Sequence, residues 1–509
     1  MRLHPHLYEA NALILLRRLS KKYGRLLTLA TVPEEEWQHL ARLGFDLLWL
    51  MGVWQRSPAG RQIALAHPGL ITEYDKALPG WTEQDVVGSP YAVHSYTLDP
   101  NLGREGELGE LRSRLNRQGL GLVLDFVPNH LALDHPWTLS YPDRFVQGSE
   151  EDVRAHPEWF FSTEGEVYLA HGRDPYFPPW TDTVQVNFFS PDLREALVGE
   201  LLRIAKVADG VRCDMAMLGL NSVFERVWGN VIWSYPRPGR EFWPYAIEKV
   251  KQQHPDFLFL AEAYWGLEGE LQEMGFDFTY DKALYDRLRY SSLSDIRRHL
   301  EMDNPRQRRW VRFIENHDEA RALTVFGPGR SLAAAAVLAT VPGLRLFHDG
   351  QLEGKRIRLP IQLGREPEET PDPEISRFYK RLLAICNDTA FHEGEWRVLR
   401  VRQAWESNQS HHNLLAWAWQ YKERTKIVVV NYASHFSQGR LNVPVPMGDV
   451  TSVTLRDELN DTAYVRDANE LHSEGLYVEL GPWSAHILDM RAEEVYQPSP
   501  PAPLPKGEG

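Results

Sequence analysis

Four short segments of the chain place acidic or polar residues directly after a run of apolar ones. The segments read LVLDFVPNH, DGVRCDMA, FLFLAEAYW and FIENHDEA, and their acids are Asp125, Asp214, Glu262 and Asp318. A helix N-cap or chance explains one such acid, but four acids in the same position are hard to produce that way. Carboxyl groups gathered in one cleft can act as a nucleophile, a general acid and a general base.

The acids need a scaffold that brings distant segments together. Apolar runs followed by helical patterns recur along the chain, and continuous runs of this kind are typical of parallel strands that are buried on both faces. The expected strands are Ala12–Leu16, Asp46–Leu50, Leu120–Asp125, Gly210–Asp214, Phe257–Ala261, Phe276–Tyr280, Trp310–Ile314 and Leu344–Phe347, with helices such as 34–43, 105–118 and 191–208 as crossovers. Eight such units predict an α/β fold, the (β/α)8 barrel, whose active groups lie at the C-terminal ends of the strands.

The remaining segments predict further domains. Residues 131–185 are rich in proline, aromatic and charged residues and are too long for a simple loop, so we expect a small inserted subdomain that splits the barrel into 1–130 and 186–389. Alternating patterns over 390–492 predict an antiparallel β-sandwich. The proline-rich tail, 493–509, is expected to be disordered.

The composition limits the classes of partner. The 509-residue chain has a formal net charge of −14 and no long run of lysine or arginine, which argues against nucleic acid or an anionic membrane as the main partner. Only two cysteines are present, Cys213 and Cys386, and the N-terminal apolar run is short and follows the acidic Glu9. We therefore expect a cytoplasmic protein that acts on a neutral or polar small substrate.

The four acidic segments carry a family resemblance. DFVPNH, GVRCDMA, AEAYW and ENHDEA resemble, in this order, the four short signatures of the α-amylase family of glycoside hydrolases. GSPYAVHSYTLDPNLG and GPWSAHIL are supporting matches, so that the resemblance runs from the first strand through the sandwich. It implies a retaining enzyme with a (β/α)8 barrel, an inserted domain B after the third strand and a C-terminal sandwich.

The resemblance also implies roles for the three acids. Asp214 looks like the nucleophile, Glu262 like the general acid/base, and Asp318 like the acid that stabilises the transition state. A retaining glycosidase needs one ionised and one protonated carboxyl group. Arg212 shares a strand face with Asp214 and should lower its pKa, although an ordinary buried ion pair has the same geometry. Apolar surroundings should raise the pKa of Glu262.

Further residues resemble the family's substrate contacts. His130 and His317 look like the two histidines that hydrogen-bond sugar hydroxyls, Tyr91 looks like the stacking platform, and Asp125 is expected to orient the site. With Arg212 they complete the predicted substrate-binding set. No cofactor is expected to be required and no metal ligand is assigned. Calcium is left open with Asn129 as a candidate ligand, since the inserted segment offers no acidic loop for it.

Three functions remain open. The first is hydrolysis of α-glucosidic bonds in malto-oligosaccharides or a related small glucan through a covalent glycosyl-Asp intermediate. The second is transglycosylation, isomerisation or phosphorolysis by the same first step; Met217 and Leu218 stand where many α-amylases have lysine and histidine, which makes endo-cleavage of long starch less certain. The third is a non-catalytic carbohydrate-binding or scaffold barrel. The sequence leaves the oligomeric state unknown.

Overall fold

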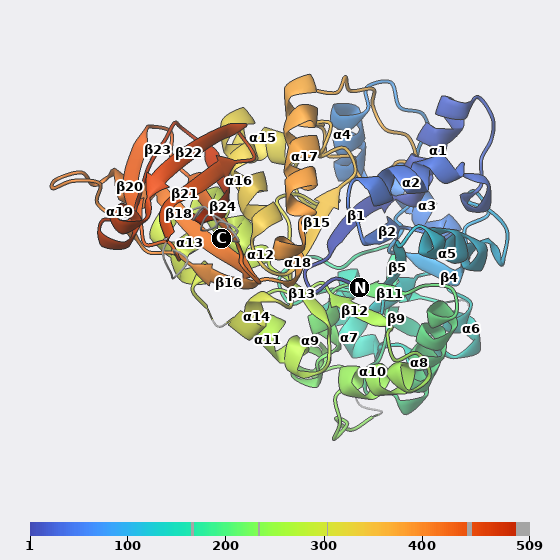
Figure 1. The fold of residues 1–509 in the computed structure, drawn as a ribbon. Helices are drawn as coiled ribbons and strands as arrows, with labels where there is room; N and C mark the ends of the chain where they lie inside the picture. Colours follow the sequence, from blue (N-terminus) through green and yellow to red (C-terminus); the bar gives the residue numbers. More distant parts are fainter. Residues whose placement is uncertain (164–166, 233–234, 303, 445–449, 495–509) are drawn as a thin grey trace, which may run out of the picture. The chain divides into compact units, whose positions relative to one another are not determined.

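The computed structural model describes residues 1–163, 167–232, 235–302, 304–444 and 450–494. The chain forms two compact units, Met1–Asn387 and Asp388–Gly509 (Figure 1). Of the tail predicted to be disordered, residues 493 and 494 belong to the last strand, and 495–509 lie outside the described residues.

Eight parallel strands close into a barrel in the first unit. Around the ring they run in the order β1-β15-β14-β13-β12-β11-β5-β2. Their bounds are β1 His6–Asn11, β2 Leu47–Met51, β5 Gly121–Phe126, β11 Gly210–Cys213, β12 Leu258–Ala261, β13 Phe278–Tyr280, β14 Trp310–Arg312 and β15 Leu344–His348. This arrangement confirms the predicted (β/α)8 barrel.

The first strand of the barrel is not where the sequence pattern placed it. The run Ala12–Leu16 is the start of helix α1 (Ala12–Tyr23), and strand β1 lies just before it. The side chain of Asn11 accepts hydrogen bonds from the backbone N–H groups of Leu13 and Ile14, so the chain turns into a helix at that point. The prediction was wrong because β1 contains buried polar residues, whereas the first turns of α1 have a continuous apolar run.

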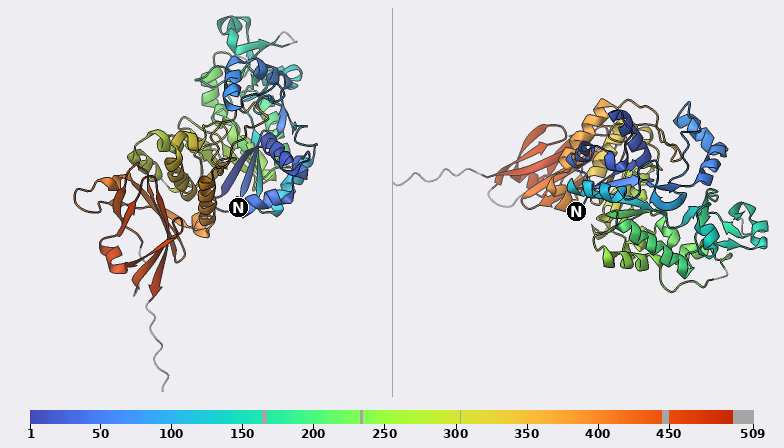
Figure 2. Two further views of the ribbon diagram at one scale, coloured as in Figure 1. Left: turned by 90° about the horizontal axis from the view of Figure 1, so that it is seen from above. Right: turned by 90° about the vertical axis from the view of Figure 1, so that its right-hand side faces the viewer.

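Helices surround the ring of strands (Figures 1 and 2). The helices predicted at 34–43, 105–118 and 191–208 correspond to α2, α5 and α8, and their bounds differ by only a few residues. The described helices of this unit, after α1, are α2 Glu34–Arg42, α3 Pro58–Ala66, α4 Pro68–Ala77, α5 Glu107–Arg117, α6 Trp137–Ser140, α7 Glu150–Ala155, α8 Pro191–Ala205, α9 Asn221–Trp228, α10 Phe242–Gln253, α11 Glu268–Glu273, α12 Lys282–Tyr290, α13 Leu293–Leu300, α14 Asn304–Gln307, α15 Ala322–Phe326, α16 Pro328–Thr340 and α17 Pro373–Cys386.

The segment between β5 and β11 has small sheets of its own. Figure 2 shows it, in cyan to green, projecting from one side of the first unit. Strands β6 (His130–Ala132) and β10 (Thr183–Gln185) pair with each other, and β7 (Gln147–Gly148), β9 (Tyr168–Ala170) and β8 (Phe160–Ser162) form a second sheet. A further pair, β3 (Trp54–Arg56) and β4 (Val93–Leu98), lies between β2 and β5 in the chain. The guanidinium of Arg173 lies over the rings of Trp159 and Trp228, which ties the segment to α9.

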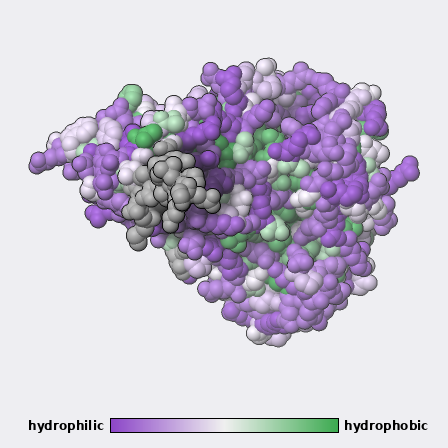
Figure 3. Space-filling model, in the orientation of Figure 1, coloured by the Kyte–Doolittle hydropathy of each residue, from purple (hydrophilic) through white to green (hydrophobic). Residues whose placement is uncertain are grey.

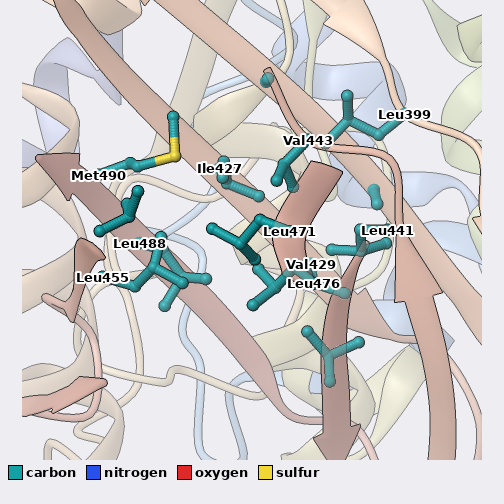
Figure 4. Close-up of a cluster of buried hydrophobic side chains, with 14 of the residues drawn as sticks. Leu399, Ile427, Val429, Leu441, Val443, Leu455, Leu471, Leu476, Leu488 and Met490 are labelled. Atoms are coloured by element: carbon teal, nitrogen blue, oxygen red, sulfur yellow. The ribbon is translucent and has the colours of Figure 1, made fainter. Parts of the chain in front are cut away.

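The second unit confirms the predicted antiparallel sandwich. One sheet has the order β16-β18-β19-β24-β21-β22 and the other β17-β20-β23. The bounds are β16 Glu395–Val398, β17 Val401–Arg402, β18 Leu414–Tyr421, β19 Arg424–Asn431, β20 Ser437–Leu441, β21 Val450–Asp457, β22 Thr462–Asp467, β23 Leu476–Leu480 and β24 Ala485–Glu494, with helices α18 Thr389–Glu393 and α19 Ala468–Ser473. Inward side chains such as Ile427, Val429 and Leu488 form its apolar core (Figure 4).

The face drawn in Figure 3 is largely hydrophilic, as the abundance of charged residues leads one to expect. Within the described ranges, no helix combines the length and the apolar character needed to cross a membrane.

The cap at the start of α1 can be tested by mutation. We expect Asn11→Ala to lower the free energy of unfolding of the first unit by about 1 kcal/mol, because two helix N–H groups lose their acceptor. Denaturant unfolding and amide hydrogen exchange in α1 would measure the loss. Asn11→Asp keeps the acceptor and serves as the matched control; equal exchange rates in both variants would contradict the assigned cap.

Candidate active site

Asp125, Asp214 and Glu262 lie at the C-terminal ends of β5, β11 and β12, and Asp318 lies in the loop that follows β14. Strands β5, β11 and β12 are direct neighbours, and Arg212 on β11 is in register with Asp125 on one side and Leu260 on the other. Beyond the last paired residues, the N–H of Asp214 donates to the Phe126 carbonyl at 2.9 Å, and the N–H of Glu262 donates to the Cys213 carbonyl at 3.0 Å. The barrel thus fixes the backbones of both residues relative to each other.

A single buried arginine joins two of the acids. The Nη1 of Arg212 donates to Oδ1 of Asp214 at 2.7 Å, and its Nη2 forms an ion pair with Oε2 of Glu262 at 2.8 Å. The Arg212 side chain is 1% exposed. Its guanidinium carbon lies between 5.2 and 5.6 Å from the ring centroids of Trp49, Tyr91 and Tyr280. These aromatic faces exclude water while they favour the cation.

Arg212 is paired with both Asp214 and Glu262, and the pKa values of these two acids also depend on their burial. Burial raises the pKa of Asp214, and the charge of Arg212 works against that rise without overcoming it. Arg212 thus acts on this pKa in the predicted direction, but complete burial, which the prediction did not consider, leaves the pKa of Asp214 above its ordinary value. Burial raises the pKa of Glu262 to about 7, with Arg212 opposing and the charges of Asp214 and Asp318 adding to the rise.

Two further groups hold Glu262 in place. The hydroxyl of Tyr264 donates to Oε1 of Glu262 at 2.7 Å, and the backbone N–H of Met215 donates to Oε2 at 2.7 Å. Met215 has φ 42° and ψ 46°, a left-handed conformation that is unfavourable for a residue with a long side chain. The strain points the N–H at the carboxyl group. The sequence analysis did not single out Tyr264 or Met215, although both lie within two residues of a predicted acid.

Asp318 belongs to a second charged group, centred on His317. The Nε2 of His317 lies 3.1 Å from Oδ2 of Asp318, and its Nδ1 lies 2.5 Å from Oε1 of Glu9 on β1. Burial alone would lower the pKa of His317, but the charges of Asp318 and Glu9 raise it to about 10. Burial alone would raise the pKa of Asp318, but His317 lowers it to about 2. The Asp318 side chain is 45% exposed, so it is open to a ligand.

The remaining predicted ligand contacts line the same region. The hydroxyl of Tyr91 lies 2.8 Å from Nε2 of His317, and the two rings are stacked. His130 packs against Trp180 of the inserted segment, and burial lowers the pKa of His130 to about 4, so its ring is neutral. Asp125 is different: its two oxygens accept from Nε1 of Trp49 and from the N–H of Gly52, so the protein itself occupies them. Burial raises the pKa of Asp125 to about 6.

The oxygens of Asn129 accept hydrogen bonds from a neighbouring side chain. Both the backbone carbonyl and Oδ1 of Asn129 accept hydrogen bonds from Nε2 of Gln185, at 2.9 and 3.0 Å. Calcium needs six to eight oxygen ligands, usually with carboxylates among them. In the described parts of the chain no cluster of three or more histidine, cysteine, aspartate and glutamate side chains is arranged to hold a metal ion. We propose no metal site at Asn129.

Exposed aromatic side chains stand beside the segment that follows Glu262. Trp265 has φ 65° and is 38% exposed, and its ring centroid lies 5.1 Å from that of Tyr176 in the inserted segment. Tyr176 is 62% exposed. Met217 and Leu218, by contrast, are buried in a short 3-10 turn and present no polar group. Exposed aromatic faces held by strained backbone next to an acid are suited to stacking on a ligand.

Comparisons with known proteins agree with this geometry. No family model matches the chain. The α-amylase MalA of Haloarcula japonica is 25% identical over 363 residues, which cover 69% of this chain and 49% of that protein. The α-1,4-glucan:maltose-1-phosphate maltosyltransferase of Cereibacter sphaeroides is 31% identical over 233 residues, 44% of this chain and 31% of that protein.

A solved structure gives a match over nearly the whole chain. The maltogenic α-amylase AmyB of Thermotoga neapolitana superposes with a TM-score of 0.67 at 20% identity, covering 96% of this chain and 98% of that one. The resemblance to the α-amylase family is confirmed. Because AmyB is only 20% identical to this chain, the structural match establishes the fold alone. The chain spans about half the length of MalA and about a third of the maltosyltransferase.

Proposed function

We propose that the protein is a retaining glycoside hydrolase that cleaves α-glucosidic bonds in malto-oligosaccharides or a related small glucan. The observation that carries the proposal is the shared contact of Arg212 with Asp214 and Glu262. Two carboxyl groups on one guanidinium lie close together, as a retaining mechanism requires, whereas inverting enzymes separate them to admit a water molecule. The α-amylase relative supports the substrate class.

The different surroundings of Glu262 and Asp214 give the two acids different roles in the reaction. With a pKa near 7, Glu262 is the protonated partner and gives its proton to the glycosidic oxygen as that bond breaks. Asp214 accepts a charge-assisted hydrogen bond from Arg212 and attacks the anomeric carbon, which forms a covalent glycosyl ester. Water then enters, Glu262 takes its proton, and the ester bond breaks to release the sugar and restore both acids.

Asp318 and His317 complete the site. The low pKa of Asp318 keeps it ionised, so its negative charge can stabilise the positive charge that develops on the sugar ring in the transition state. Its exposure leaves an oxygen free to bind hydroxyl groups of the sugar. Tyr91, which stacks with His317, provides an aromatic face at the same place.

A second candidate function is transfer of the glycosyl group to another sugar. Glu262 protonates the leaving sugar, so the aromatic residues beyond it face the side where an acceptor binds. The pair Trp265 and Tyr176 offers a sugar a stacking surface there that water cannot use. A maltosyltransferase among the relatives supports this candidate. The partner in either case is an oligosaccharide, and the low cysteine content supports a cytoplasmic location.

Substitution of the general acid tests the first function. We expect Glu262→Gln to lower kcat/KM for maltoheptaose at least about a hundredfold, because the leaving oxygen loses its proton donor. With a nitrophenyl maltoside, whose leaving group needs little protonation, the loss in the first step should be much smaller. The exposed Glu273→Gln on α11 is the control. An equal loss with both substrates would assign Glu262 another role.

The pH dependence follows from the raised pKa of Glu262. The group is active when protonated, so kcat/KM should fall about tenfold per pH unit above pH 7. A pH profile measured on the unmodified protein gives this limb directly. Activity that stays constant to pH 9 would show that Glu262 is not the acid.

The choice between water and a sugar acceptor can be measured at Trp265. We expect Trp265→Ala to lower the ratio of transfer products to hydrolysis products at least about threefold, since the acceptor loses a stacking surface. Chromatography of products from maltotriose gives the ratio. Trp405→Ala, at an exposed tryptophan of the second unit, is the matched control. If the ratio is unchanged in the Trp265 variant, this surface does not bind the acceptor.

A further inference from the structure

A buried glutamate on the first barrel strand has a contact that the mechanism above does not explain. Glu9 is fully buried, and its Oε1 lies 2.5 Å from Nδ1 of His317 and 3.3 Å from the His317 backbone nitrogen. Its other oxygen, Oε2, has no hydrogen-bond partner among the described residues. The residue was missed from the sequence because the first strand was placed at 12–16; a strand at His6–Asn11 puts Glu9 near its C-terminal end.

A buried carboxylate in this position destabilises the folded protein unless a nearby cation compensates its charge. Removing a charge from water costs several kcal/mol, and a single partner with one oxygen left unsatisfied is a poor solution for stability alone. The compensating cation is the imidazolium of His317. An amide at the same position could accept the same hydrogen bond from Nδ1, so the negative charge of Glu9, rather than its shape, is the property to explain.

We propose that Glu9 is a positioning residue, which fixes the ring of His317 with Nδ1 protonated and keeps that ring positively charged beside Asp318. The proposal rests on the proposed function, since it concerns the same site. With Nδ1–H donated to Glu9, the Nε2–H of His317 points at Oδ2 of Asp318 and the hydroxyl of Tyr91. Asp318 is then held as a carboxylate by a cation that cannot rotate away.

The groups that face His317 all agree with this assignment. The acids Glu9 and Asp318 contact its two ring nitrogens, and Asp125 on β5 adds a more distant negative charge. Trp49 on β2 meets the ring edge to face, and Tyr91 stacks on it. The cations Arg212 and Arg358 act on Asp318, and Nη1 of Arg358 donates to the Asp318 carbonyl.

Nitrogen NMR of the histidine rings gives a test that is independent of activity. The full-length chain is labelled with ¹⁵N in its histidine rings, and the His317 signals are assigned by their loss in His317→Gln. In the unmodified protein we expect both ring nitrogens of His317 to remain protonated at pH 8. A neutral ring at that pH would overturn the proposal, even if no Glu9 variant folds.

Glu9 variants then separate charge from geometry. In Glu9→Gln we expect the titration of His317 to move down by about 1 to 3 pH units and kcat/KM for maltoheptaose to fall about tenfold to a hundredfold. Glu9→Asp restores the charge and should recover part of the pH shift. The matched control is Asp457→Asn, which removes the carboxylate of another buried acid paired with a histidine, His486, in the sandwich.

The outcomes separate the two proposals. An unchanged His317 titration in Glu9→Gln would refute the role of Glu9, whatever the activity. A shifted titration in a protein that neither cleaves nor transfers any glucan would leave the charge assignment intact and refute the proposed function. A shifted titration with unchanged kcat/KM and pH profile would show that the His317 charge is not needed for the reaction, and this too would refute a positioning role.

Discussion

The guanidinium of Arg212 is the contact on which the rest of the site depends. It is buried near the C-terminal end of β11, is paired with Asp214 and Glu262, and lies close to three aromatic rings. A buried cation of this kind is stable only while its acids remain in place, and the acids can be buried only because the cation is there. The parallel register of β5, β11 and β12 is what lets three separate stretches of sequence meet around it.

The balance of charge around this arginine explains why the acids differ. Arg212 and His317 are the two cations nearest the reaction centre, whereas Glu9, Asp125, Asp214, Glu262 and Asp318 are acids. Two positive charges cannot keep five buried or half-buried carboxyl groups ionised, so some pKa values must rise. Burial raises the pKa values of Glu262, Asp125 and Asp214, while Asp318 keeps its charge beside His317. Glu262, the proton donor of the proposed mechanism, is thus one of the groups whose pKa is raised.

Much of this arrangement could be predicted from the sequence, for a physical reason. Parallel barrel strands are buried on both faces, so their apolar runs are easy to find and the polar residues that end them stand out. The same logic failed at β1, where buried His6 and Glu9 interrupt the pattern while the start of α1 is apolar. The sharing of Arg212 with Glu262 was also missed. It depends on which strands become neighbours and on how deeply the residues are buried, and neither is a property of local sequence.

The acceptor side of the site follows a different principle from its centre. At the centre, Arg212, Asp214 and Glu262 are buried at the ends of neighbouring strands. Beyond Glu262 the aromatic residues Trp265 and Tyr176 are exposed, one on a strained turn and the other in the inserted segment. Covalent chemistry at Asp214 is the same whether water or a sugar arrives next. If Trp265 and Tyr176 bind the acceptor as proposed, the time that an acceptor stays on this surface decides between hydrolysis and transfer. Substitutions in these loops can then change that balance without disturbing the buried charges.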